Sequence, residues 1–106
     1  MNIRLTVRKL TMLPDAKAHA KDRFSRLEKF SQGIQNVEVV LRGGERQVYC
    51  EAIVRIDSRS AVIVEVGGET VQAAVDLAAA KCERQLRIGK ERSSGRRRRG
   101  EAAKGR

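Results

Sequence analysis

The sequence predicts an α+β domain in which a four-stranded sheet packs two helices on one face, in the order β-α-β-β-β-α. Four short stretches alternate apolar and polar residues with a period of two, as strands with one wet face do. Two longer stretches repeat apolar residues every three or four positions, as amphipathic helices do. Turn-forming residues separate these stretches, which indicates that each is a separate element.

The four expected strands are residues 2–8, 37–42, 47–57 and 61–66. In the first of them, Ile3, Leu5 and Val7 share the apolar face. Because a helix separates the first two strands, these two are expected to be parallel and joined by a right-handed crossover. Gly43-Gly44 and residues 58–60 are short turns, so the remaining connections should be hairpins.

The first expected helix begins at Pro14 and runs to near Gly33, although Leu13 is a poor N-cap. Its apolar positions are Ala16, Ala20, Phe24, Leu27 and Phe30. Arg23 falls inside this apolar arc on a helical wheel. Two interpretations are open: the stem of Arg23 lies at the edge of the core with its charge reaching solvent, or the guanidinium is held in a fixed place.

The second expected helix spans residues 70–92 and has two unlike halves, with Thr70 as the N-cap. Its apolar stripe comprises Val71, Ala74, Val75, Ala78, Cys82 and Leu86. Its cations lie off that stripe and in the second half, at Lys81, Arg84, Arg87, Lys90 and Arg92. The first turns should therefore anchor the helix in the core, and the last turns should project positive charge. The helix dipole favours two or three such cations but does not explain five.

The composition indicates one domain over residues 1–92 and a basic tail, expected to be disordered, over residues 93–106. The chain has 106 residues and a net charge of +10, which implies a polyanionic partner, most often nucleic acid. The sequence shows no membrane-spanning run and no secretory signal, so we expect a cytoplasmic protein that does not bind membranes. Cys50 and Cys82 are too far apart for a CxxC motif and fit reduced thiols.

Neither enzymatic chemistry nor a cofactor is expected. The sequence lacks phosphate-binding, dinucleotide-binding and nucleophile-elbow motifs, and no small-molecule substrate is indicated. The single histidine, His19, is expected to be a surface residue without a catalytic role, and no metal site is expected. An RNA-binding sheet that stacks bases would need several exposed aromatic residues, and Tyr49 is the sole candidate.

The charged residues of the sheet and those of the helices are expected to have different roles. The outer sheet face mixes signs, which cross-strand pairing explains better than ligand binding does; its charged residues are Arg4, Arg8, Glu38, Arg42, Glu51, Arg55 and Glu65. The cations of both helices, in contrast, should form one positive field that contacts the phosphates of structured RNA. The tail, with Arg96-Arg97-Arg98-Arg99, would strengthen such binding by counterion release.

Two segments, within this order of elements, resemble the ribosome hibernation promoting factors and ribosome-associated inhibitors: DRFSRLEKF at 22–30 and KCERQL at 81–86. The resemblance covers about residues 1–90. It implies a fold similar to a double-stranded-RNA-binding domain and a non-enzymatic protein that binds the small ribosomal subunit and its ribosomal RNA. Such a protein occupies the mRNA/tRNA channel and inhibits translation under stress or in stationary phase. The RNA-binding residues that it implies here are Arg23, Arg26, Lys29, Lys81, Arg84, Arg87 and Lys90.

The sequence also departs from that family. Many members open the second helix with Asp-Met-Tyr, whereas this chain has Thr70-Val71-Gln72, so any contact of that aromatic ring is not expected. Long members have a second domain that pairs two ribosomes, and pairing by such a domain is not expected here. Two alternatives stay open: a general binder of double-stranded or structured RNA that acts through the basic tail, and a protein-interaction domain with an acidic protein as its target.

Overall fold

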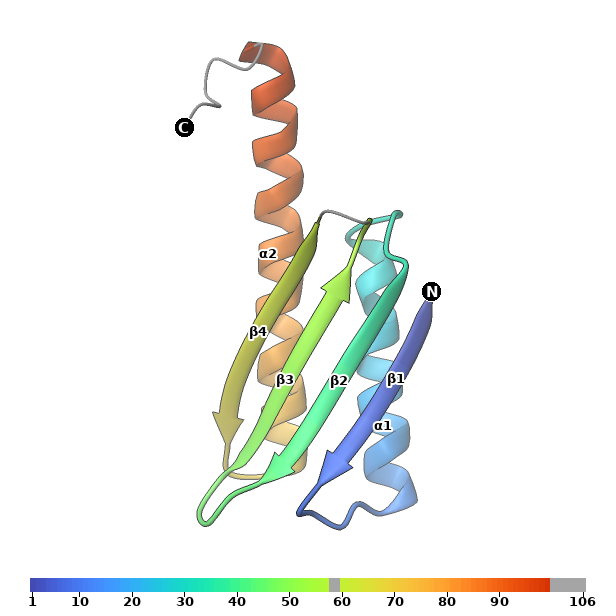
Figure 1. The fold of residues 1–106 in the computed structure, drawn as a ribbon, viewed down its shortest axis with the longest axis vertical. Coiled ribbons are helices and arrows are strands. Elements are labelled where there is room, and N and C mark those ends of the chain that lie inside the picture. Colours follow the sequence, from blue (N-terminus) through green and yellow to red (C-terminus); the bar gives the residue numbers. More distant parts are fainter. Residues whose placement is uncertain (58–59, 100–106) are drawn as a thin grey trace.

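The computed structural model describes residues 1–57 and 60–99, with the side chains of residues 90–99 outside that description. In chain order the elements are β1 (Asn2–Arg8), α1 (Pro14–Ser25), the 3₁₀ helix η1 (Arg26–Lys29), β2 (Asn36–Gly43), β3 (Val48–Arg55), β4 (Ala61–Gly68) and α2 (Val71–Arg99) (Figure 1). The predicted order β-α-β-β-β-α is confirmed.

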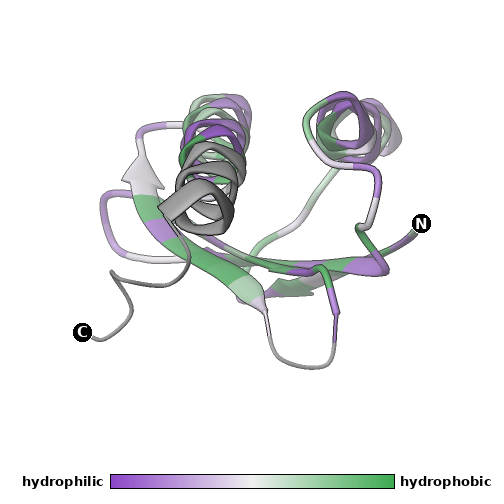
Figure 2. Ribbon diagram, turned by 90° about the horizontal axis from the view of Figure 1, so that it is seen from above, coloured by the Kyte–Doolittle hydropathy of each residue, from purple (hydrophilic) through white to green (hydrophobic). Residues whose placement is uncertain are grey.

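The sheet has the strand order β1-β2-β3-β4. β1 pairs with β2 in parallel, whereas β2 with β3 and β3 with β4 are antiparallel pairs. Both helices lie on the same face of this sheet, and the other face is left open, as the view along the helices shows (Figure 2). The predicted α+β class, with two helices on one face of four strands, is therefore confirmed.

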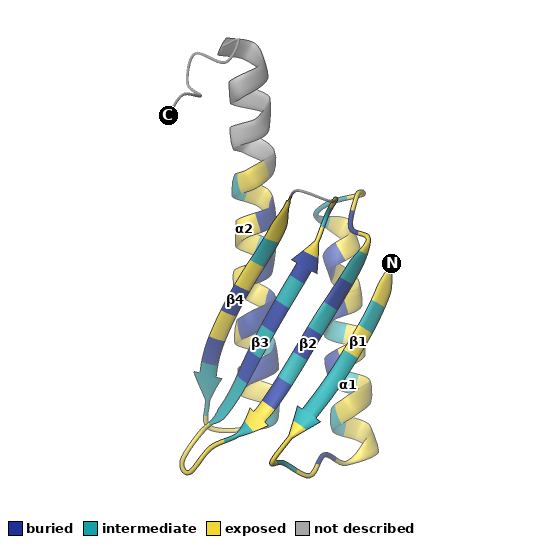
Figure 3. Cartoon of the chain, viewed as in Figure 1, coloured by how far each residue is buried: buried dark blue, intermediate teal, exposed yellow. Residues whose placement is uncertain are grey.

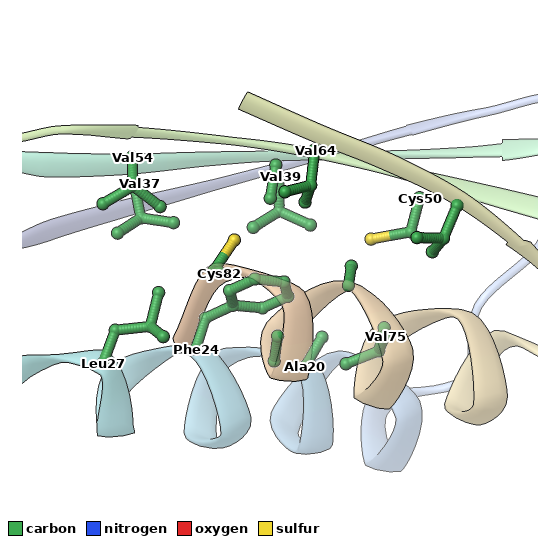
Figure 4. Packing of buried hydrophobic residues seen from close by; sticks show 14 of the residues in the cluster. Ala20, Phe24, Leu27, Val37, Val39, Cys50, Val54, Val64, Val75 and Cys82 are labelled. Carbon is green, nitrogen blue, oxygen red and sulfur yellow. The ribbon is translucent and has the colours of Figure 1, made fainter. Parts of the chain in front are cut away.

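The core lies between the sheet and the two helices. Burial alternates along β2 and β3, because successive side chains point to opposite faces of a strand (Figure 3). From the helix side, Phe24, Leu27 and Val75 are fully buried, and Phe24 and Leu27 point toward the valines of the sheet (Figure 4). Each such side chain contributes roughly 1.5–3 kcal/mol to folding, so an aliphatic core with few aromatic rings is sufficient to hold both helices in place.

The first helix is shorter than the sequence predicts. It ends at Ser25 and tightens into η1, which stops at Lys29, short of Gly33. The Ser25 hydroxyl donates a hydrogen bond of 2.7 Å to the carbonyl oxygen of Asp22. A serine that bonds the preceding turn competes with the regular helical ladder, which explains the change of pitch at this point. At the other end Leu13 provides no side-chain cap, as expected.

The second helix begins as predicted and continues further. Thr70 Oγ1 accepts a hydrogen bond of 3.0 Å from the Ala73 N–H, which confirms it as the N-cap. The sequence predicts an end at Arg92 and a disordered tail from Ser93, but α2 continues to Arg99, so residues 93–99 are helical. The core already anchors the first turns of this helix, so further residues, including the poor helix former Gly95, add to it without a new nucleation step. Residues 100–106 lie outside the described part of the chain.

Both cysteines are buried in the core as free thiols. Burial raises the pKa of Cys50 from 9.0 to about 12, with smaller contributions from Cys82 and Glu51. Burial likewise raises the pKa of Cys82 from 9.0 to about 12, with a smaller contribution from Glu83. The thiolate form is therefore disfavoured in the folded chain, and both residues act as small apolar side chains.

These thiols predict a loss of stability in alkaline solution. The unfolded chain releases thiol protons above pH 9.0, whereas the folded chain holds them up to about pH 12. The free energy of unfolding should therefore fall between these two pH values, by up to about 1.4 kcal/mol per pH unit for each thiol, and should be insensitive to the thiols below that window. Denaturant titrations from pH 8 to pH 10.5 measure this slope. A Cys50→Ala/Cys82→Ala variant should show a shallower slope, and an equal slope would contradict the prediction.

Candidate nucleic-acid interface

Arg23 lies between the two helices and is paired within the protein. Its Nη1 donates to Glu83 Oε2 at 2.5 Å, and its Nε lies 3.8 Å from Asp76 Oδ1. The side chains of Arg23 and Glu83 are only 18% and 17% exposed. Of the two interpretations of Arg23, the structure shows a guanidinium held in a fixed place, at the edge of the core. Its positive charge is matched by carboxylates of α2 and is not free for a ligand.

His19 extends the same interhelix cluster. Its Nε2 lies 2.8 Å from Asp76 Oδ1, so Asp76 is shared between His19 and Arg23. The sequence predicts a surface histidine without a catalytic role and does not indicate its contact with Asp76, which joins residues 57 positions apart. We call His19, Arg23, Asp76 and Glu83 the interhelix clasp. It contains an imidazole, a guanidinium and two carboxylates, so it ties α1 to α2 without adding to the net positive charge.

Two further predicted residues lie at the end of α1. Arg26 and Lys29 are both exposed on η1. Arg26 Nη2 forms an ion pair of 2.9 Å with Asp22 Oδ2, and both side chains are more than half exposed. Exposed pairs of this kind contribute at most about 1 kcal/mol, so a phosphate can replace the aspartate. Lys29 has no ion pair within the described residues.

The cations of α2 wind around the helix. Lys81, Arg84 and Arg87 are exposed and follow one another at intervals of three residues, so each is rotated by about 60° from the one before. Arg87 points toward the end of α1, because its guanidinium lies over the Phe30 ring, 5.7 Å from the centroid. Lys81 is accordingly turned to the side away from α1. The backbone of Lys90 belongs to α2, but its side chain lies outside the described part of the structure.

The cations of the two helices therefore do not all contribute to one positive field, because Arg23 is paired within the protein and the others that the structure describes are not buried between the helices. Asp76 and Glu83 lie between the helices and are occupied by His19 and Arg23. The other described cations of the predicted site lie on η1 and on the middle turns of α2. We call this group the cationic band: Arg26, Lys29, Lys81, Arg84 and Arg87. Its members are exposed and only Arg26 among them has a carboxylate partner within the described residues.

This surface can bind anions but offers little else. Within residues 1–57 and 60–99, no three histidine, cysteine or acidic side chains are grouped so that they could hold a metal ion. None of the described helices is both long enough and apolar enough to cross a bilayer. Guanidinium and ammonium groups suit phosphate oxygens, which RNA presents at every nucleotide.

Residues 3–94 match the model of the family described as Sigma 54 modulation protein / S30EA ribosomal protein. The chain belongs to this family. The resemblance to hibernation factors that the sequence indicated is thereby confirmed, and the chain is a member of a family of ribosome-associated factors. Among curated proteins, none matches the chain.

Two solved structures share the fold of this chain. A ribosomal subunit interface protein from Coxiella burnetii superposes with a TM-score of 0.78 at 20% identity, covering 86% of this chain and 99% of that one. The N-terminal domain of Protein Y from Thermus thermophilus superposes with a TM-score of 0.73 at 23% identity, covering 84% and 99% of the two chains. At these identities the likeness shows the fold alone.

Proposed function

We propose that this chain binds the small ribosomal subunit in the mRNA/tRNA channel and inhibits translation under stress or in stationary phase. The observation that supports this most is the cationic band, which presents exposed positive charge on the helix side of a member of a ribosome-associated family. Carboxylates that would otherwise weaken the field are taken up by the interhelix clasp. Contacts to phosphate position a protein on RNA without reading its sequence, as is needed for a folded ribosomal RNA surface.

The RNA-binding residues of this proposal are those of the cationic band, together with Lys90, which follows Arg87 at the same three-residue spacing. Arg23 has a different role in it. Because its guanidinium is engaged by Glu83, Arg23 fixes the spacing of α1 and α2, and thereby the spacing of Arg26 and Arg87. No catalytic step is part of the proposal, and it requires no cofactor.

Competition with mRNA and tRNA for purified small ribosomal subunits tests whether the protein binds in the channel. The protein should sediment with isolated small subunits, and prior binding of mRNA with initiator tRNA should prevent this. It should also inhibit a purified translation system at the initiation step. Binding that is unaffected by bound mRNA and tRNA would show that the site lies elsewhere on the subunit. Absence of the protein from ribosomal fractions of starved cells would count against the function as a whole.

Charge reversal within the cationic band gives a residue-level prediction. Arg84→Glu and Arg26→Glu should each lower the affinity for small subunits by about tenfold or more, because a charge-assisted contact to phosphate is replaced by repulsion. Both positions are exposed, so the free energy of unfolding should change by less than about 0.5 kcal/mol. Equilibrium binding and denaturant unfolding of the same preparations measure the two effects.

Lys21→Glu is the matched control for these reversals. Lys21 is exposed on α1, two residues from both His19 and Arg23, which face α2, so Lys21 points to the opposite side of its helix. The change in net charge is the same as in Arg26→Glu. If the Lys21 variant weakened binding as much as the other two, net charge rather than the cationic band would govern affinity.

A further inference from the structure

The open face of the sheet has a distinctive row of side chains at the end where β1 stops. Arg8, Arg42, Tyr49 and Gly67 are neighbours across the four strands in the pairing register. This row faces away from the helices, because the residues next to it along β2 and β3 are buried in the core. The Arg42 guanidinium lies over the Tyr49 ring, 4.7 Å from its centroid.

Two more cations adjoin this row. Lys9 follows Arg8 directly, and Arg46 lies in the turn between β2 and β3. We call Arg8, Lys9, Arg42 and Arg46 the basic corner; all four are exposed. Glu45 lies in the same turn, and the next row across the sheet holds Glu51 opposite Glu65 on the far two strands. Within the described residues, none of the four cations forms an ion pair.

Cross-strand pairing, expected to explain the charges of this face, does so at its other end. There Arg55 forms an ion pair of 3.4 Å with Glu38. At the basic corner, in contrast, Arg8 has Arg42 as its cross-strand neighbour. Like charges directly opposite each other on neighbouring strands repel. Lys9 in addition has a φ of 54°, in the left-handed region that a lysine rarely occupies. A bound anion would relieve the repulsion between the two arginines.

We propose that the basic corner binds the phosphate backbone of a second RNA segment, separate from the segment that the cationic band contacts. This inference rests on the proposed function and extends it. Arg42 lies over the Tyr49 ring, so the ring positions a guanidinium instead of stacking a base, and planar guanidinium forks match phosphate oxygens. Figure 2 shows that both helices cover one face of the sheet, whereas the burial pattern of β2 and β3 places Arg42 and its neighbours on the other face, so one straight duplex cannot touch both basic surfaces. The domain therefore fits a gap between two RNA segments.

Arg8→Gln is the test, because it leaves the stacking of Arg42 on Tyr49 in place. The affinity for purified small ribosomal subunits should fall by about tenfold at low salt. The slope of log affinity against log salt should become shallower by about 0.7–0.9, the value of one phosphate contact. The midpoint of thermal unfolding of the free protein should stay the same or rise, since a like-charged neighbour of Arg42 is removed. A residue with a merely structural role would lose stability instead.

Arg4→Gln is the matched control. Arg4 lies on the same strand and the same face, but its cross-strand neighbour is Glu38, so this variant should bind within about twofold of the unmodified protein. If Arg8→Gln behaved like Arg4→Gln while Arg84→Glu lost affinity, the basic corner would be ruled out and the proposed function would stand. If neither Arg8→Gln nor Arg84→Glu lost affinity, both proposals would fall.

Protein-free ribosomal RNA of the small subunit separates RNA from an acidic ribosomal protein as the partner. The difference between Arg8→Gln and the unmodified protein should persist on this RNA. If the difference appeared on whole subunits but vanished on the protein-free RNA, the basic corner would contact protein, and the RNA assignment would be overturned.

Discussion

Replacing Glu83 with alanine is expected to lower the free energy of unfolding by about 2 kcal/mol. The substitution leaves the Arg23 guanidinium, only 18% exposed, without its nearest partner, and a shielded charge that loses its partner is costly. Asp76 lies 3.8 Å from Arg23 Nε and recovers part of this cost. Chemical denaturation of the purified variant measures the change.

Two further variants show whether the interhelix clasp is the cause. Asp22→Ala removes a carboxylate from an exposed pair with Arg26, and should cost about 0.5 kcal/mol or less. The double variant Arg23→Met/Glu83→Leu replaces both partners with apolar side chains of similar size, and should be more stable than Glu83→Ala. A double variant as unstable as the single one would show that the loss arises from packing around position 83 and not from the unpaired guanidinium.

Replacing Gly43 with alanine is expected to lower the free energy of unfolding by about 2–3 kcal/mol. A Cβ at this position would lie 2.1 Å from the carbonyl oxygen of Lys9, which is backbone and cannot rotate away. The parallel pairing of β1 and β2 near Arg8 and Arg42 would have to open to make room. The thermal midpoint and the free energy of unfolding both report this loss.

Gly89 provides a control of opposite sign. It lies inside α2, and a Cβ there would meet no atom within 4 Å. Gly89→Ala should therefore stabilise the protein by up to about 1 kcal/mol, because alanine loses less backbone entropy than glycine in a helix. If both alanine variants changed stability in the same direction, the steric explanation for Gly43 would be wrong.

The fold was predictable from sequence because its signals are local. Alternation along the strands and the apolar stripes of the two helices are written within a few residues of one another, and the Thr70 cap needs only its own first turn. Boundaries were less predictable. The end of α1 depends on a single hydroxyl of Ser25, and the extension of α2 past Arg92 depends on a helix that the core has already started.

The candidate site was predictable only in its residue types. The sequence showed that Arg23 sits inside an apolar arc, but its pairing with Glu83 joins positions 60 residues apart and could not be read from spacing. The adjacency of Arg8 and Arg42 likewise depends on the register of two parallel strands. Composition identifies the cations of a chain, whereas packing decides which of them are neutralised inside the protein and which face outward.

The length of α2 has a consequence for how this domain can change over time. Leu86 is the last buried residue of the helix that the structure describes, yet the helical backbone continues to Arg99 and rises beyond the end of the sheet (Figure 1). Once the anchored turns exist, each further turn forms without a new nucleation step. The projecting part of α2 can therefore lengthen or shorten by whole turns while the turns that pack on the sheet stay the same, so the length of this helix is free to evolve separately from the core.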